Sequence, residues 1–338
     1  MPSQKQPILF DPETSPQLVV LIDIEEEFDW DEDFDRQATE TSHLTRLQGA
    51  IDVFQRFGIV PVGVCTYPVA AQGASAAIIE ELVSSGRMVA GAHLHPWVTP
   101  PHDEPLERRL SFPGNLPREL EAAKLSQLTE AISLALGTRP QVYQAGRYGL
   151  GPATRELLRE QGYLVDMSVC PPFDYSSEDG PDYSRESNHP TWHGSGETKL
   201  LSLPVTGAFV GASGRWAPAL FKAASKPSLS WAHLPGVLAR TGLAERLRLS
   251  PEGQTVSDMR RLTTHLYSQG CRVFNFSFHS PTLLPGSTSY VRSEADAEDF
   301  LQRLSQYFEW FLGDFAGRST TPLALHQELS SAPTDRGL

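Results

Sequence analysis

Apolar runs and amphipathic segments alternate along the chain, and the alternation repeats about seven times. Residues 17–24, QLVVLIDI, form a continuous apolar run, as expected for a strand that is buried on both faces. Residues 43–58 place apolar side chains at helical spacing and end in Gly58, a common helix stop. Repeated strand–helix units are typical of a parallel α/β barrel or a doubly wound sheet.

The same pattern predicts the other elements of the fold. Further strands are expected at 59–65, 87–95, 141–146, 163–169, 198–207 and 271–279. Further helices are expected at 74–86, 117–137, 152–162, 256–270 and 294–315. Two stretches interrupt the rhythm: residues 171–196, rich in Ser, Pro, Gly and Asp, predict a long loop, and residues 207–253 predict an inserted helical cap. We expect a single domain over 1–338, with both interruptions on its functional face.

Composition narrows the class of protein. With 40% hydrophobic and 20% charged residues, the chain has the make-up of a soluble globular protein. Its formal net charge of −13 argues against nucleic-acid and membrane partners, because both bind basic surfaces. No apolar run approaches the length of a membrane span, and the first residues lack the basic and apolar regions of a secretory leader. A cytoplasmic location is therefore expected.

The three cysteines agree with a reducing compartment. They form an odd and scattered set. Cys65 and Cys271 lie in or beside strand-like runs, where a small buried thiol is expected.

Chemically active side chains gather at the ends of the predicted strands. The first strand ends in Asp23 and Glu25, and the third in His93 and His95. Later strands end near Arg147, Asp166 and His279, in that order. Because the carboxyl ends of parallel strands form the active-site face of α/β folds, these residues predict one functional site.

The types and spacings of these residues predict a metal-dependent hydrolase. Asp23 and Glu25 are two residues apart, as are His93 and His95, so each pair faces one side of an extended backbone. One carboxylate and two imidazoles form the three-ligand set of a catalytic zinc site, which keeps an open position for water. A second carboxylate can take a proton from the water, and a further histidine can protonate the leaving group. The expected cofactor is a divalent metal ion, with Zn²⁺ first.

The order of these motifs resembles the polysaccharide deacetylases with the NodB homology domain, carbohydrate esterase family 4, from residue 17 to about 315. The first acidic motif is matched by LIDIEEEFDW, the histidine motif by GAHLHPW and the arginine motif by YQAGRYGLG. The later aspartate and histidine motifs are matched by GYLVDMS and FNFSFHSPTL. Within the family, the chain looks most similar to the WalW-type branch.

The resemblance implies a deformed seven-stranded (β/α) barrel that hydrolyses an N-acetyl or O-acetyl group of a carbohydrate. It implies that Asp23 is the base, and that Glu25, His93 and His95 bind the metal. His279 is then expected to protonate the leaving group. Arg147 is expected to orient Asp23 or to hold Asp166, with Asp166 as a supporting residue. Tyr148 and Trp97 lie within the motifs and are expected to form walls of the pocket.

Two departures from the family pattern keep alternatives open. The family's two histidines are four residues apart, whereas here position 97 is Trp and the second histidine is His95. Gln144 stands where a strict alignment places the arginine, which leaves open whether Arg147 replaces it.

The expected substrate is a carbohydrate or a small amide. One alternative is hydrolysis of a cyclic imide or ureide, or of another non-sugar C–N bond, a reaction for which some relatives of this fold dispense with the metal. A further alternative is a non-catalytic carbohydrate-binding relative, although such a protein is expected to lose Asp23 or His279.

Overall fold

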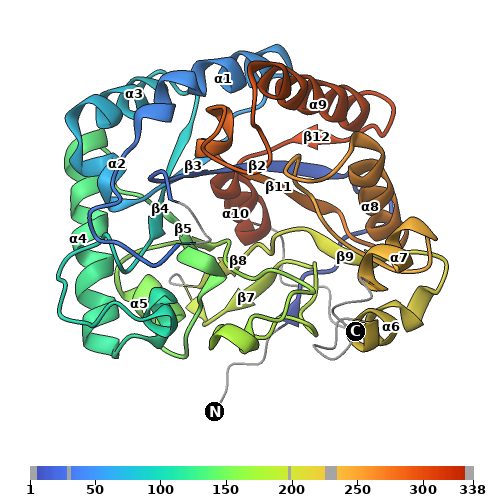
Figure 1. Cartoon of the computed structure of the whole chain (residues 1–338), viewed down its shortest axis with the longest axis horizontal. Coiled ribbons are helices and arrows are strands. Elements are labelled where there is room, and N and C mark those ends of the chain that lie inside the picture. The colour runs from blue at the N-terminus through green and yellow to red at the C-terminus, as the bar shows by residue number, and fades with distance from the viewer. Residues whose placement is uncertain (1–5, 29–31, 197–198, 225–233, 332–338) are drawn as a thin grey trace.

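The protein folds as a curled, open half-barrel of parallel strands wrapped by helices (Figure 1). The computed structural model describes residues 6–28, 32–196, 199–224 and 234–331. In these residues the parallel strands occur in the spatial order β8, β6, β5, β4, β3, β2, β11. Their bounds are β2 Gln17–Ile24, β3 Val62–Cys65, β4 Val89–Leu94, β5 Val142–Ala145, β6 Val165–Asp166, β8 Leu200–Ser202 and β11 Val273–His279. Every strand predicted from the apolar runs is present, and the predicted barrel class is confirmed.

Helices cover the outside of the curl. They are α1 Leu47–Arg56, α2 Tyr67–Ala71, α3 Gly73–Ser84, α4 Arg118–Leu136, α5 Thr154–Glu160, α8 Val256–Ser268 and α9 Glu294–Leu312. A further helix, α10 (Pro322–Ser331), appears inside the curl in Figure 1. The start of α8 is fixed by a capping box between Thr255 and Asp258, a pattern that satisfies backbone N–H groups at a helix start.

Alternation along each strand separates an outer core from an inner one. Even-numbered residues of β2, such as Leu18 and Ile22, belong to the outer core under the helices. Odd-numbered residues, such as Val19 and Leu21, belong to the inner core together with Leu325 of α10. The side chains that follow in the odd phase therefore point into the curl, where the strands end.

Several short elements were not predicted. β7 (Thr191–His193) lies within the expected loop 171–196, pairs antiparallel with β8 and is followed outward by β1 (Gln6–Pro7). β12 (Arg318–Ser319) pairs with the start of β2. The segment 207–253 contains two short helices, α6 (Ala217–Ala224) and α7 (Leu234–Arg240), but it also contains an antiparallel pair, β9 (Gly207–Val210) with β10 (Glu245–Arg248). The predicted helical cap is thus a mixed segment of strands and helices.

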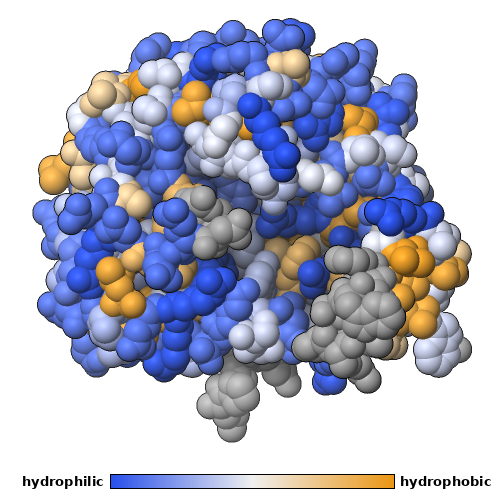
Figure 2. Space-filling model, viewed as in Figure 1, coloured by the Kyte–Doolittle hydropathy of each residue, from blue (hydrophilic) through white to orange (hydrophobic). Residues whose placement is uncertain are grey.

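The thiols agree with the sequence analysis, which expects Cys65 and Cys271 to be buried. Cys65, Cys170 and Cys271 are free and buried. Among the described residues, no helix has both the length and the apolar character needed to cross a membrane. Figure 2 shows a mostly hydrophilic face with a hollow near its middle.

Candidate active site

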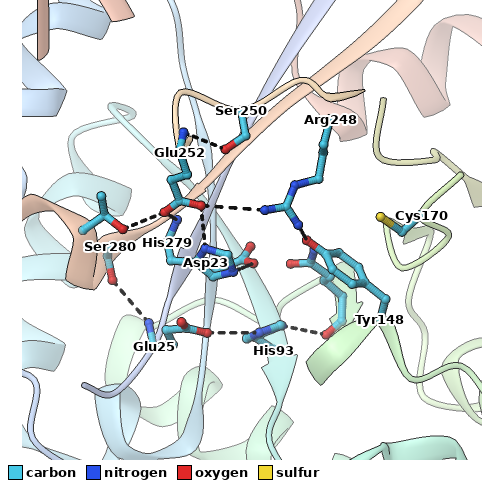
Figure 3. Close-up of polar contacts among 12 residues, drawn as sticks. Asp23, Glu25, His93, Tyr148, Cys170, Arg248, Ser250, Glu252, His279 and Ser280 are labelled. Atoms are coloured by element: carbon cyan, nitrogen blue, oxygen red, sulfur yellow. Dashed lines mark hydrogen bonds and ion pairs between the residues drawn. The ribbon is translucent and has the colours of Figure 1, made fainter. Parts of the chain in front are cut away.

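A small pocket lies at the carboxyl ends of the strands and brings together residues from distant parts of the chain (Figure 3). Its volume is about 210 Å³. The lining residues are Asp23, Glu25, His93, His95, Ala145, Arg147, Tyr148, Tyr175, Glu178, Arg248 and His279. Six of the seven predicted site residues are in this set, and Asp166 is not.

The strand phase explains why the predicted metal ligands meet. Glu25 extends the inward phase of β2, and His93 and His95 extend that of β4. Glu25 Oε2 lies 3.5 Å from His93 Nε2 and 3.5 Å from His95 Nε2. All three residues are buried, and their ligand atoms lie within 4.8 Å of one another. This is the spacing that a single metal ion requires of its ligands.

The hydrogen bonds at Nδ1 of His93 and of His95 determine which ring nitrogen faces Glu25. His93 Nδ1 lies 3.1 Å from the backbone carbonyl oxygen of Gln144, so Nδ1 must carry the proton that it donates. His95 Nδ1 donates in the same way to the Glu26 carboxylate, at 2.7 Å. Both Nε2 atoms therefore turn a lone pair toward Glu25. Metal-binding histidines are typically oriented by such partners.

The electrostatics of this cluster also fit a cation. Burial raises the pKa of Glu25 to about 7, although the neighbouring imidazoles of His279 and His95 oppose the change. Burial lowers the pKa of His93, which favours the neutral imidazole that binds metals. A buried carboxylate that faces two lone pairs is costly in free energy, and a divalent ion would neutralise it. The residues present therefore fit the predicted metal, and zinc is compatible with this donor set.

Asp23 and His279 form a pair beside the group of Glu25, His93 and His95. His279 lies at the end of β11, opposite Asp23 in the strand register, and its Nε2 is 3.5 Å from Asp23 Oδ2. Burial raises the pKa of Asp23 despite the nearby imidazoles. The carboxylate of Glu252 is 2.8 Å from His279 Nδ1. Burial opposes the charged form of His279, but the negative charges of Glu252, Glu25 and Asp23, together with the hydrogen bond to Glu252, outweigh it and raise the pKa of His279 to about 10.

Two residues of the predicted site have other partners. Arg147 forms an ion pair with Glu178 and stacks over the ring of Phe112, 4.0 Å from its centroid. Asp166 is fully buried, and its Oδ2 lies 3.4 Å from Arg155 Nε of α5. The predicted contact of Arg147 with Asp23 or Asp166 is therefore not found, and this expectation is corrected.

The physical reason is the strand phase of β6. Val165 and Met167 belong to the inner core, so Asp166 between them points outward to the helices. Arg147 follows β5 in a turn where its own φ is 54° and that of Tyr148 is 58°. This left-handed backbone takes the chain out of the strand phase.

Several residues in or beside the pocket were missed because nothing in the sequence separates them from ordinary surface residues. Glu26 and Glu252 stand in stretches that look like solvated acidic or loop sequence, yet they orient His95 and His279. Arg248 ends β10 in the segment predicted as a cap. Tyr148 lines the pocket as expected. Trp97 instead stacks behind His95, with ring centroids 4.2 Å apart.

A buried chain of hydrogen bonds supports the backbone at Glu25. The Glu25 N–H donates to Ser280 Oγ at 3.3 Å, and Ser280 Oγ is 2.8 Å from His43 Nε2. His43 Nδ1 in turn lies 3.2 Å from Glu27. These contacts join the residues after β2 to those after β11, so they hold the acidic and histidine ends of the site in register (Figure 3).

No protein-family model and no curated protein matches the sequence. Solved structures do match. A candidate polysaccharide deacetylase from Mycobacterium smegmatis has a TM-score of 0.55 at 16% identity, over 100% of this chain and 98% of that chain. The PuuE allantoinase has a TM-score of 0.54 at 13% identity, over 97% and 96% of the two chains. A 4-α-glucanotransferase from Thermococcus litoralis has a TM-score of 0.50 at 12% identity, over 94% of this chain and 41% of its own.

These comparisons identify the fold. The chain has the curled α/β barrel fold that the polysaccharide deacetylase and the allantoinase share. The narrower placement in the WalW-type branch stays a prediction.

Proposed function

We propose that the protein is a metal-dependent hydrolase that removes an acetyl group from an N-acetylated or O-acetylated carbohydrate or a small amide. The observation that carries this proposal is the meeting of two units in one pocket. One is the buried cluster of Glu25, His93 and His95, and the other is the Asp23–His279 pair. The first unit suits a divalent cation, and the second suits proton transfer. The likeness of the fold to a polysaccharide deacetylase supports the same reaction class.

Glu25, His93 and His95 would hold the metal ion, which when bound supplies Lewis-acid chemistry to the acyl carbonyl and the attacking water. Asp23 accepts a proton from that water. Burial raises the pKa of Asp23, which makes it a stronger base than a solvated aspartate. His279 donates a proton to the departing amine or alcohol. Glu252 fixes the ring of His279 and favours its protonated form at neutral pH.

Hydrolysis of a cyclic ureide or imide is the second candidate. It is favoured by the match to the allantoinase, whose TM-score is nearly equal to that of the deacetylase. It is also compatible with the His-x-His spacing, which departs from the family's histidine pair. Both candidates use the same pocket and break a bond to an acyl carbon. They differ in substrate and in the need for the metal.

The deciding experiment combines metal analysis with a panel of substrates. Protein purified without chelator should carry about one equivalent of zinc or a similar ion, and His93→Ala should lose it. Acetate release should then be measured on N-acetylated and O-acetylated sugars, and ring opening on allantoin and hydantoin. Acetate release that stops on metal removal supports the deacetylase. Metal-free protein that opens only the cyclic substrates would overturn it in favour of the second candidate.

A further inference from the structure

Arg248 is a charged pocket residue that the proposed chemistry does not use. It ends β10, lines the pocket, and has a side chain that is 20% exposed. In Figure 3 its guanidinium points toward Glu252 and Tyr148. A partly exposed cation that faces a site for small molecules needs an explanation beyond packing.

The hydrogen bonds of Arg248 leave donors for a ligand. A guanidinium has five N–H donors in a planar fork. Nη1 donates to the Tyr148 hydroxyl at 2.7 Å, whereas Nη2 is 3.9 Å from Glu252 Oε2, too far for a hydrogen bond. Its other polar neighbours are the hydroxyl of Tyr175 and the thiol of Cys170, a weak acceptor.

Glu252 cannot turn fully to Arg248, because its two oxygens already have partners. Its Oε2 is bound by His279 Nδ1 at 2.8 Å, and its Oε1 accepts from Thr282 Oγ1 at 2.6 Å and from the His279 N–H at 3.0 Å. In the described part of the chain, Arg248 is thus close to a carboxylate whose two oxygens are already hydrogen-bonded to other residues.

The other arginine of the pocket is already matched. Arg147 pairs with Glu178, donates to Ser111 and stacks on Phe112. Its charge and its planar face are therefore used within the protein. Arg248 is the better placed of the two to receive an anionic group from outside.

The size of the pocket limits the ligand. At about 210 Å³ it lies below the roughly 300–1,000 Å³ typical of ligand sites. Tyr175 and Glu178, from the long loop after β6, line it beside Arg248. Such a space suits a single sugar unit or a small amide.

We propose that Arg248 binds a carboxylate of the substrate, so that the substrate is a small acidic amide such as an N-acetylated aminouronic acid. This inference rests on the proposed function for the identity of the bond that is cut. Arginine suits the role because its fork binds both oxygens of a carboxylate through charge-assisted hydrogen bonds. Arg248 then places the anionic end of the substrate, while Asp23 and His279 act on the acyl end.

The test compares acidic and neutral members of matched substrate pairs. The acidic members are N-acetylglucosaminuronate and N-acetylgalactosaminuronate, and the neutral members are the parent N-acetylhexosamines. With zinc-loaded protein, kcat/KM for acetate release should favour an acidic member by about 10- to 100-fold, as expected for charge-assisted hydrogen bonds. In Arg248→Met this preference should fall to about one, mainly through KM. Arg248→Lys should keep part of it, and it also serves if the Met variant folds poorly.

Arg246→Met is the matched control. Arg246 lies two residues earlier in β10, stacks over Phe173 at 4.2 Å from the ring centroid, and does not line the pocket. This variant removes the same charge from the same strand and should keep the preference. A wild-type protein that treats both members of each pair alike would overturn the inference. An equal loss on both members in Arg248→Met would also overturn it, and would make Arg248 a positioning residue for Glu252 and Tyr148.

A binding measurement separates this inference from the proposed function. Galacturonate and galactose carry no acyl group, so calorimetry on the purified protein measures anion recognition without hydrolysis. Arg248-dependent binding of galacturonate over galactose, in protein that releases no acetate from any substrate, would refute the deacetylase and retain the carboxylate site. Acetate release from neutral sugars without any preference for anions would do the reverse.

Discussion

Asp23 and Glu25 are two acidic residues at the end of one strand, but their side chains have different partners. Both are buried and point into the pocket, yet Glu25 faces two imidazole lone pairs and Asp23 faces His279. Asp23→Asn should therefore lower kcat by about 10²–10⁴-fold while the metal content is unchanged. Steady-state kinetics together with metal analysis of the same samples check this. Loss of metal in Asp23→Asn would instead make Asp23 a ligand.

His279 is expected to act on the leaving group, so its importance should depend on the substrate. His279→Ala should lose a similar factor on an N-acetyl sugar, because the departing amine needs a proton. On an activated phenyl acetate, whose leaving group needs no proton, the variant should recover much of its rate, and Asp23→Asn should not. Rates of all three proteins on both substrates decide the matter. Equal losses for His279→Ala on the two substrates would argue against the acid role.

The residue scale also marks the limit of prediction from sequence. Five site residues could be predicted because each lies at the end of an apolar strand and on the side that points inward. They are Asp23, Glu25, His93, His95 and His279. Asp166 follows such a strand too, but one position out of phase, so it meets Arg155. In so short a strand, the alternation of apolar residues is too brief to reveal the phase. Partners such as Glu252 and Arg248 come from loops and from a polar strand, where no periodicity points to the pocket.

At the scale of elements, α4 anchors the segment that follows His95. Lys124 of α4 is fully buried, and its Nζ donates to the backbone oxygens of Pro96 at 2.9 Å and Thr99 at 2.6 Å. It also pairs with Glu104 at 3.1 Å. The clamped segment directly follows His95. The long helix therefore holds the backbone next to His95, one of the proposed metal ligands.

Lys124→Met should destabilise the protein by up to about 3–5 kcal/mol, because it removes the nearer cation from the buried Glu104 and leaves only Arg36, whose Nη2 is 3.9 Å from the carboxylate. It should also weaken metal binding, since the loop after His95 loses its anchor. Urea unfolding and metal titration measure the two effects. The double variant Lys124→Met/Glu104→Gln should regain part of the stability without regaining the metal affinity. A single variant with unchanged metal affinity would show that the clamp serves stability alone.

The elements themselves were predictable to different degrees. Long apolar strands such as β2 and β11, and helices with clear signals at both ends such as α4, follow directly from periodicity. β7, β9 and β10 are three or four residues long, and β7 and β10 mix polar with apolar side chains, so their existence depends on the partner strand. β10 matters most, because it places Arg248 in the pocket.

At the scale of the whole molecule, one buried acid away from the site should make stability depend on pH. Glu121 of α4 is 2% exposed and accepts a hydrogen bond from Thr154 of α5. Burial raises the pKa of Glu121 to about 7, from an ordinary value of 4.5. A raised pKa means that the folded protein holds this proton more tightly than the unfolded chain does. The contribution to stability is therefore complete below pH 4.5 and is lost as the pH rises to about 7.

Glu121→Gln should remove this dependence, because the amide stays neutral and can still accept from Thr154. Relative to the wild type, the variant should gain stability between pH 5 and pH 8, by up to about 3 kcal/mol at 1.36 kcal/mol per pKa unit. Denaturant unfolding at several pH values measures the difference. Glu119→Gln, on the exposed side of the same helix, is the control and should give a flat difference. A flat difference for Glu121→Gln as well would contradict the buried-acid explanation.

An ion bound by Glu25, His93 and His95 should also stabilise the whole fold. Glu25 follows β2 and His95 follows β4, with β3 between them, so an ion bound there ties separate parts of the sheet together. An ion that binds only the folded chain stabilises it by about 2.7 kcal/mol at a free concentration of 100 Kd. Zinc added to chelator-treated protein should therefore raise the thermal midpoint, and His93→Ala should show no such rise.

Glu26→Gln should have an intermediate effect on metal affinity. It keeps all three proposed ligands and weakens only the hydrogen bond at His95 Nδ1. Loss of such an orienting carboxylate typically costs about 10–100-fold in metal affinity. The variant should respond to zinc, but at concentrations higher by about that factor. Thermal melts across a zinc titration of the three proteins measure this order. If the wild type showed no shift, the ion would not bind the folded protein, and if His93→Ala shifted equally, the ion would bind elsewhere; either result would refute the proposed site at Glu25.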